Sequence, residues 1–511
     1  MLPSDNADTT TGLRVGLEPS FVAEGLFRED ISTLALVRRF LVVGTPLMLA
    51  TGAQFSIGTV LLSTVGKKFG VEELGGVALA LGMMNATAFA VSSGVCGALE
   101  TVLSQVYGVF QSQDKEKTVY LYGVYTQRMA IILIALSIPV GIVVIYIDVL
   151  LKYIGEQPEV VYYTGRFCCV AAFGIPIMQV FQLITRYLSC QHVTAPLSLA
   201  VLVGAVLNPA LQYIFTHMFG FDGSAVAWVF LYGVIDLFLV AYTYISGLYV
   251  KTWGGWDNKA LTNIKSLVNL AVPSLAMSIS EWAVMEIIMA FAGFGTPTEL
   301  AAFTISVQVF SLCWSIPSGT MLIVPVFIGN AIGEGKPLLA KRIANVAIAL
   351  VAVISVFDII VCWVFEDSIP LLFSDSEEVG HVYRQLMRFV FPYHMVDTFQ
   401  STVLGILRGC GLQKIGAIVT AAALCGVGAP LAFFLFFHTR LGIEALWIGP
   451  FCAVGLLAAP SYIYLLYWHI DWGMLRPQNE ISAACIEDVV VVDDILLEEE
   501  VCRTAERSHK G

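Results

Sequence analysis

Charged residues are scarce in this chain. Asp, Glu, Lys and Arg together make up 13% of its 511 residues, whereas a soluble protein of ordinary composition carries about 25%. Hydrophobic residues reach 57%, and the mean hydropathy is +0.80. So few charges cannot coat a globule of this size in water. The composition therefore excludes a soluble globular domain and indicates a polytopic membrane protein.

Several motifs that define other classes of protein are also absent. No GxxxxGK[ST] nucleotide-binding loop occurs, which argues against an ATP-driven pump. The eleven cysteines form no CxxC pair and no Cys/His cluster with metal-ligand spacing. No basic patch interleaved with aromatic residues is present, so we expect no nucleic-acid partner. We predict that the protein is not an enzyme and has no catalytic residues, no cofactor and no metal site.

Both ends of the chain are polar. From Arg476 onward, nine acidic residues face four basic ones, and this accounts for part of the net charge of −12. The N-terminal stretch lacks the basic-then-apolar pattern of a signal peptide, so we expect the first membrane helix to act as the targeting signal. The C-terminal string "DDILL" (Asp493–Leu497) resembles an acidic dileucine sorting signal.

Long apolar runs fill the region between these ends. Twelve of them approach the roughly 20 residues needed to cross the hydrocarbon core. We predict an all-α membrane protein with transmembrane helices at 40–63, 75–98, 120–146, 166–189, 196–217, 224–248, 267–293, 300–328, 342–365, 387–408, 414–437 and 443–468.

The distribution of Lys and Arg predicts the orientation, because cytosolic loops are enriched in both. With the N-terminus inside, the cytosolic loops hold most of the basic residues, among them Arg38, Arg39, Lys115, Lys117, Lys251, Lys259, Lys265, Lys336, Lys341, Arg342, Lys414 and Arg476. The opposite loops hold mainly Lys67, Lys68, Lys152, Arg384 and Arg440. We therefore expect both termini in the cytosol and a location in the plasma membrane or in a vacuolar or endosomal membrane.

The two halves of the chain carry matching features in the same order. Pro46 and Pro273 each lie early in the first span of a half, and Ser93-Gly94 matches Ser318-Gly319. "RYLSCQ" ends span four and "RGCGLQ" ends span ten, so that Arg186 pairs with Arg408. Six spans precede the second half, which makes this a parallel repeat.

The repeat predicts two pseudo-symmetric six-helix lobes that rock around a site near the midplane. We expect a cytosolic N-terminal tail at 1–37, an N-lobe at 38–250, an inter-lobe cytosolic linker at 251–265, a C-lobe at 266–470 and an acidic, disordered cytosolic tail at 471–511. We expect the protein to be a monomer.

Four stretches resemble motifs of the multidrug and toxic compound extrusion (MATE) transporters, eukaryotic type. They are "GALETVLSQVYG" (Gly97–Gly108), "EWAVME" (Glu281–Glu286), "DTFQSTVLGILRGCGLQKIGA" (Asp397–Ala417) and "GIEALWIG" (Gly442–Gly449). The resemblance implies twelve helices in two lobes and ion-coupled export of organic compounds, commonly cations.

Some positions depart from that family's pattern. Phe327 stands where the eighth-helix signature usually has Arg, and span one has no acid from Leu41 to Val65, where prokaryotic members often carry one. Gln308 stands at a position that is acidic in some animal members. The absence of the first-helix acid speaks against a cation site built on it.

The few charges inside the predicted spans point to function. A charged side chain at the bilayer centre costs about 2.5–3.5 kcal/mol, so such residues face protein or water. We predict a substrate and proton site that includes Glu281, Asp397, Glu286, Gln308 and Asn208. For Asn208, binding substrate and tying helices together are both open.

The other intramembrane charges carry a different interpretation. We interpret Asp236 and Asp358 as structural and Glu100, near the membrane edge, as a residue that orders a loop. Glu281 and Glu286 lie about 140° apart on an ideal helix, so both cannot point at the same neighbour.

These acids suggest a coupling mechanism. Burial disfavours the charged form of a carboxylic acid, and a cationic substrate favours it. Proton and organic cation would therefore compete for one site, and competition during lobe movement gives antiport. We predict a secondary transporter whose partners are an organic small molecule, H⁺ and the lipid bilayer. Na⁺ coupling and a flippase for a lipid-linked or amphiphilic substrate stay open as alternatives.

Overall fold

The computed structural model describes residues 31–113, 116–154, 157–373, 376–478 and 481, and within these ranges it is helical with no strand. Residues 1–30 of the predicted N-terminal tail (1–37) and most of the acidic C-terminal tail, including Asp493–Leu497, lie outside the described residues. Helix α2 begins at Thr33, inside the predicted tail.

The first half of the chain forms six spans. Their helices are α2 (Thr33–Lys68), α3 (Val71–Met84) with α4 (Ala90–Gln113), α5 (Glu116–Ile145), α7 (Pro158–Ala171) with α8 (Ile175–Ser189), α9 (Ala195–Phe219) and α10 (Asp222–Ile245). A π-helical segment, Asn85–Phe89, joins α3 to α4, and the short α6 (Ile147–Ile154) follows α5. We call these helices the first lobe.

The second half repeats the plan after a linker that contains α11 (Tyr249–Thr252). Its helices are α12 (Ile264–Ala292), α13 (Pro297–Gly333), α14 (Pro337–Val364), α15 (Glu377–Cys410), α16 (Gln413–Ala423) with α17 (Ala429–His438), and α18 (Ala445–Cys452) with α19 (Ala459–Tyr464). We call them the second lobe.

The twelve predicted spans are confirmed, since each lies on a helix of the structure. Most helix ends fall within a few residues of the predicted bounds, but α4 continues to Gln113, well beyond the predicted end at 98, and α15 begins at Glu377, before the predicted start at 387. Among the described residues, 11 helices are long and apolar enough to cross a membrane. The twelfth, α15, has 34 residues and is set apart by its polar side chains, which include His394, Asp397 and Gln400. A span this polar has to face protein rather than lipid, and nineteen of its residues are buried.

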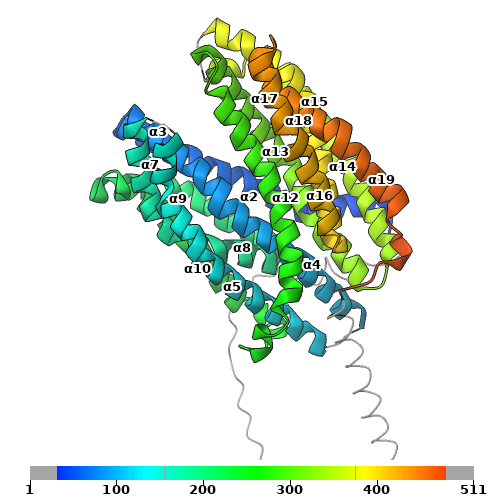
Figure 1. Cartoon of the computed structure of the whole chain (residues 1–511). Coiled ribbons are helices and arrows are strands. Elements are labelled where there is room, and N and C mark those ends of the chain that lie inside the picture. Colours follow the sequence, from blue (N-terminus) through cyan, green and yellow to red (C-terminus); the bar gives the residue numbers. More distant parts are fainter. Residues whose placement is uncertain (1–30, 114–115, 155–156, 374–375, 479–480, 482–511) are drawn as a thin grey trace, which may run out of the picture.

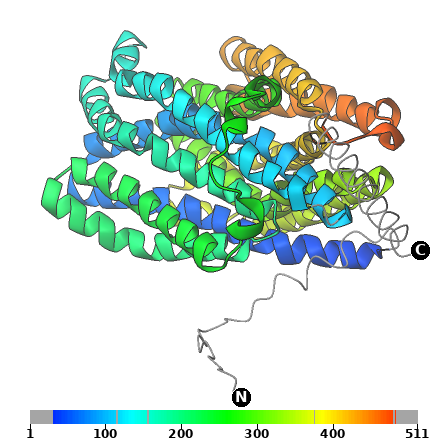
Figure 2. The same ribbon diagram turned by 90° about the horizontal axis from the view of Figure 1, so that it is seen from below.

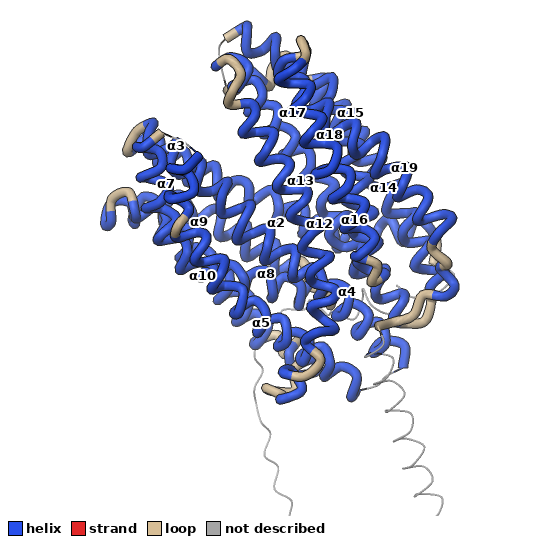
Figure 3. Tube along the Cα trace, in the orientation of Figure 1, coloured by secondary structure: helices blue, strands red, loops and turns tan. Residues whose placement is uncertain are grey.

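The two lobes meet at one end and diverge at the other. In Figure 1 the first lobe runs from blue to cyan and the second from green to orange, and they separate toward α3 and α17. We call the opposite end, where they meet, the linker end. Figure 2 views the molecule from that end, and Figure 3 places the linker loops there.

A crossing of α4 with α13 joins the lobes near the linker end. A Cβ added at Gly108 of α4 would collide with the carbonyl oxygen of Asn330, and a Cβ added at Gly333 of α13 would collide with that of Gln105. The repeat pairs Gln105 with Asn330 and Gly108 with Gly333. The members of each pair are separated by the same number of residues as Ser93 and Ser318. The crossing is therefore pseudo-symmetric, as the repeat predicts.

The linker is held by the first lobe. The Gln127 side chain donates to the carbonyl oxygen of Gly255 at 2.7 Å and accepts from the backbone N–H of Asp257 at 3.1 Å. Arg128, which is buried, donates to the carbonyl oxygen of Lys259 at 3.1 Å. The second lobe thus begins at α12, directly after a segment fastened to the first lobe.

The chain beyond the last span returns to the α4–α13 crossing. The backbone N–H of Gln478 donates to Oε1 of Gln105 at 2.9 Å, and Ile481 is fully buried. This part of the C-terminal segment therefore packs on the helices at the linker end.

The crossing predicts the effect of a single methyl group. In Gly108→Ala the new Cβ meets a backbone oxygen that side-chain rotation cannot move, and overpacking of this kind costs about 1–3 kcal/mol. We expect a lower thermal unfolding midpoint for the purified protein. Gly233→Ala is the matched control, because a Cβ there meets nothing within 4 Å. Equal midpoints for the two variants would contradict the close crossing.

Candidate functional site

Two of the predicted acids come together in the second lobe. Glu281 lies on α12, and Nε2 of Gln400, on α15, donates to its Oε1 at 3.5 Å. Asp397 lies three residues before Gln400, so both project from the same face of α15. Asp397 and Glu281 are close enough to interact electrostatically. The sequence therefore predicted this pair of residues, and the fold places them at one site.

Aromatic side chains surround the Asp397 carboxyl group. The Tyr393 hydroxyl donates to its Oδ1 at 3.3 Å, and Trp314 of α13 lies beside it. The Tyr393 ring packs against Phe310 and Trp447, with ring centroids 5.3 and 5.5 Å away. Asp397 is 8% exposed, whereas Glu281 is half-buried. The site is thus two carboxyl groups at different depths beside a packed aromatic cluster.

Glu286 points to the other lobe. A Cβ added at Gly82 of α3 would lie 3.5 Å from its Oε2. One turn earlier on α12, Trp282 contacts Phe89, with ring centroids 6.1 Å apart. This face of α12 is turned to the first lobe, while Glu281 is turned to α15. The helix geometry predicted that the two glutamates diverge, and the fold shows where each one points.

The other two predicted site residues lie apart from the acid pair. Asn208 is fully buried in α9, and its Nδ2 donates to the carbonyl oxygen of Ile57 in α2 at 2.9 Å. This bond ties two helices of the first lobe together. Gln308 of α13 is exposed. Neither residue is brought to Glu281 or Asp397 by a contact that the described structure records.

A buried acid–histidine pair lies one turn from Asp397. Oδ2 of Asp358, in α14, is 3.6 Å from Nε2 of His394, in α15, and both side chains are at most 3% exposed. Ser355 and Thr398 form a hydrogen bond of 2.9 Å between the same two helices. The sequence reasoning passed over His394, although its place three residues before Asp397 put both on one helix face.

Glu100 connects the lobes at the linker end. Its Oε1 is 3.2 Å from Nε of Arg186, and its Oε2 is 4.0 Å from Nη1 of Arg408. These are the two arginines that the repeat pairs. Arg186 belongs to the first lobe and Arg408 to the second, so one buried carboxylate serves both halves of the repeat. Glu100 therefore does more than order a loop.

Hydrogen bonds next to Glu100 cap the end of α15 from the other lobe. The Thr101 hydroxyl donates to the carbonyl oxygen of Arg408 at 2.6 Å, and Nε2 of Gln105 donates to that of Gly409 at 3.2 Å. The last carbonyl groups of a helix have no partner within the helix. The Arg408 oxygen also accepts from the backbone N–H of Gly411 at 3.0 Å. Separating the lobes at this end would therefore remove one of two donors from the Arg408 oxygen and the Gln105 donor from the Gly409 oxygen.

A reciprocal contact comes from the second lobe. Nδ2 of Asn330 is 2.7 Å from Nε2 of His192, in the loop that follows α8. Burial lowers the pKa of the His192 ring to about 4, so the ring is neutral at physiological pH and can accept from the amide. The contacts are thus reciprocal. Helix α4, the second span of the first lobe, holds the end of α15, and α13, the second span of the second lobe, holds the loop after α8.

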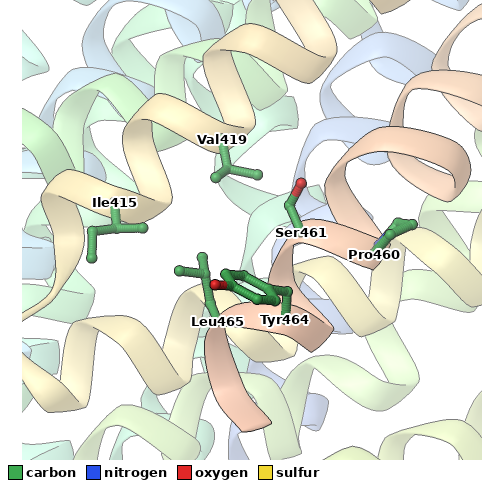
Figure 4. Close-up of a pocket in the computed structure, with 6 residues that line it drawn as sticks. All are labelled: Ile415, Val419, Pro460, Ser461, Tyr464 and Leu465. Carbon is green, nitrogen blue, oxygen red and sulfur yellow. The ribbon is translucent and has the colours of Figure 1, made fainter. Parts of the chain in front are cut away.

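A surface groove between α16 and α19 is lined by Ile415, Val419, Pro460, Ser461, Tyr464 and Leu465 (Figure 4). It contains none of the predicted acids. Its lining is almost wholly apolar, as expected of a helix surface that faces lipid. We therefore place the candidate site at Glu281 and Asp397 and not in this groove.

Twelve spans in two repeat-related lobes, with the Glu281–Asp397 acid pair in the second lobe, define the class of a polytopic membrane transporter. The MatE family model matches residues 46–214 and 273–434, that is, one stretch in each lobe. The chain belongs to the MatE family.

Curated relatives agree with this assignment. Multidrug and toxin extrusion protein 1 of Danio rerio is 30% identical over 418 residues, which cover 81% of this chain and 69% of the relative. Multidrug and toxin extrusion protein 2 of Mus musculus is 28% identical over 416 residues, covering 81% and 71%.

Solved structures share the fold. The eukaryotic MATE transporter AtDTX14 superposes with a TM-score of 0.78 at 22% identity, over 86% of this chain and 97% of that one. A multidrug resistance MATE transporter in an outward-facing conformation gives a TM-score of 0.72 at 19% identity, over 89% and 99%. The predicted family and fold are thereby confirmed.

The bridge at Glu100 predicts a large effect of a small substitution. Glu100→Gln keeps the shape of the side chain but leaves Arg186 and Arg408, 11% and 19% exposed, without their shared countercharge. Breaking a buried ion pair costs about 3–5 kcal/mol. We expect a clear drop in the thermal unfolding midpoint.

Asp148→Asn is the matched control. The Asp148–Lys152 pair is more exposed, with side chains 28% and 64% accessible, and exposed pairs contribute less than about 1 kcal/mol. If the two variants unfolded at the same temperature, Glu100 would not hold the lobes together.

Proposed function

We propose that this protein is a secondary active transporter that exports organic cations in exchange for protons by alternating access of its two lobes. The observation that carries the proposal is the meeting of Glu281 and Asp397 inside the second lobe, next to Tyr393 and Trp314. The names of the curated relatives, which describe extrusion of drugs and toxins, support the same substrate class.

The acid pair suits a site that exchanges one cation for another. Two carboxylates in a low-dielectric site repel each other, and either a proton or an organic cation relieves the repulsion. The proton and the organic cation then compete, because both bind to the same carboxyl groups. Aromatic rings beside the carboxyl groups add attraction for an organic cation through their negative faces. Competition at one site is sufficient for antiport.

The contacts at the linker end suit the alternating movement. Glu100, Thr101 and Gln105 bond across the lobes on one side of the acid pair only. With the linker end in the cytosol, as the Lys and Arg distribution predicts, this conformation is closed to the cytosol. Opening the cytosolic side requires these bonds to break, and their loss contributes to the free-energy difference between the two states.

We expect the coupling of proton movement to substrate movement to take place in the second lobe. In the repeat, Asp397 corresponds to Ile175 and Glu281 to neutral Gln54 or its neighbours. Apart from Glu100 at the linker end, the described part of the first lobe has one buried acid, Asp236, on α10. This residue stands outside the matched motifs, and so provides a control for the substitution of an acid by an amide.

The test is transport by reconstituted vesicles loaded with a fluorescent organic cation. We expect a proton gradient to drive movement of the cation by the wild-type protein. Glu281→Gln and Asp397→Asn should each reduce that movement to the level of protein-free vesicles, because each removes a group that holds the proton. Asp236→Asn should retain it.

Two outcomes would contradict the proposal. Unchanged proton-driven transport by both site variants would remove the acid pair from the mechanism. Transport that follows an imposed sodium gradient at equal pH on both sides, and ignores a proton gradient, would replace the proton by Na⁺. Folding of each variant is checked by its elution as a single species and by its thermal unfolding midpoint.

A further inference from the structure

We propose that Cys313 and Cys362 form a reversible disulfide bond that joins α13 to α14 and slows transport. The two Sγ atoms lie 3.2 Å apart and come from neighbouring helices of the second lobe. Neither the proposed coupling mechanism nor the relationship to the MatE family assigns a role to this pair.

The geometry of the pair needs little change. A disulfide bond is about 2.05 Å long, so the sulfur atoms have to approach by about 1 Å. Cysteine side chains rotate freely about one bond, and both helices already hold the sulfur atoms in contact. The bond can therefore form without moving either helix by a turn.

Both thiols are within reach of a reagent. Cys313 and Cys362 are half-buried, unlike Cys96, Cys190 and Cys410, which are buried. Cys362 is followed by Trp363, which is 65% exposed and lies on an apolar surface of α14. An uncharged oxidant that enters the bilayer can reach this surface, which points to hydroperoxides as the oxidant class.

The chemistry balances with one hydroperoxide for each bond. One thiol loses its proton, and its sulfur attacks the peroxide oxygen and becomes a sulfenic acid as the O–O bond breaks. The leaving oxygen takes up that proton and departs as an alcohol, or as water when the oxidant is hydrogen peroxide. The second thiol then attacks the sulfenic sulfur, the disulfide bond forms and water leaves. A dithiol reductant reverses the bond by thiol–disulfide exchange.

The position of the pair connects it to the acid site. Cys313 is adjacent to Trp314, which lies beside Asp397. Cys362 is one turn beyond Asp358, which pairs with His394. A bond between α13 and α14 would therefore join two helices that both pack against α15. The expected effect on transport rests on the proposed function, whereas the formation of the bond does not.

The bond itself is tested by mass spectrometry on the full-length protein in vesicles. The vesicles are treated with cumene hydroperoxide, the remaining thiols are blocked with N-ethylmaleimide, and the protein is digested. We expect one cross-linked pair of peptides that holds Cys313 and Cys362 and disappears after dithiothreitol. Cys313→Ser and Cys362→Ser should each lack it. Cys425→Ser, which removes an exposed thiol elsewhere, should keep it.

The consequence is tested on the same vesicles. Peroxide should slow transport several-fold in the wild-type protein and in Cys425→Ser, and dithiothreitol should restore it. Cys313→Ser should be insensitive to peroxide. The disulfide proposal is wrong if N-ethylmaleimide still blocks both thiols after oxidation. It is equally wrong if the two thiols are converted separately to sulfinic acids. If the cross-link forms and transport is unchanged, the disulfide bond does not slow transport, and that part of the proposal is wrong.

The two proposals fail in distinguishable ways. If the untreated wild-type protein moves no cation under a proton gradient, the proposed function is wrong, while the mapped cross-link still decides whether the disulfide forms. If untreated transport is present and the cross-link is absent, only the disulfide is wrong.

Discussion

The crossing of α4 with α13 is the contact on which the rest of the structure depends. Glycines at Gly108 and Gly333 let the two backbones approach, and each faces a carbonyl oxygen of the other helix. Lipid gives helices little hydrophobic reason to associate, so close packing of small residues and hydrogen bonds have to supply the attraction. Around this crossing, Thr101 and Gln105 bond to α15, and Asn330 bonds to the loop after α8.

The symmetry of the crossing contrasts with the asymmetry of the charges. Each lobe uses its second span to hold the other lobe, but a single carboxylate, Glu100, lies between the two repeat-related arginines, Arg186 and Arg408. The acid pair Glu281 and Asp397 likewise belongs to one lobe. The frame of the protein is thus duplicated, whereas the charges placed on it differ between the two lobes.

Much of the frame could be predicted from the sequence. Apolar runs predicted the spans because crossing hydrocarbon demands about 20 apolar residues. The span α15 shows the limit of that rule: its apolar run predicted a span at 387–408, yet it is too polar to count among the 11 helices that hydropathy identifies in the described residues. Candidate site residues were chosen because charge inside a span is costly. That reasoning selected Glu281 and Asp397, but it also selected Asn208, which bonds to the backbone of its own lobe.

The sequence by itself determined the class of protein, the number of spans, the repeat and the identity of the intramembrane acids, because all of these follow from composition and order along the chain. Only the tertiary structure decided which acids meet. Glu281 and Glu286 are five residues apart, yet one faces Gln400 and the other faces Gly82 of the opposite lobe. The pairing of Asp358 with His394 and the bridge through Glu100 likewise join distant parts of the chain. Such contacts depend on how helices rotate and cross, and that is set by packing against neighbours rather than by any local pattern.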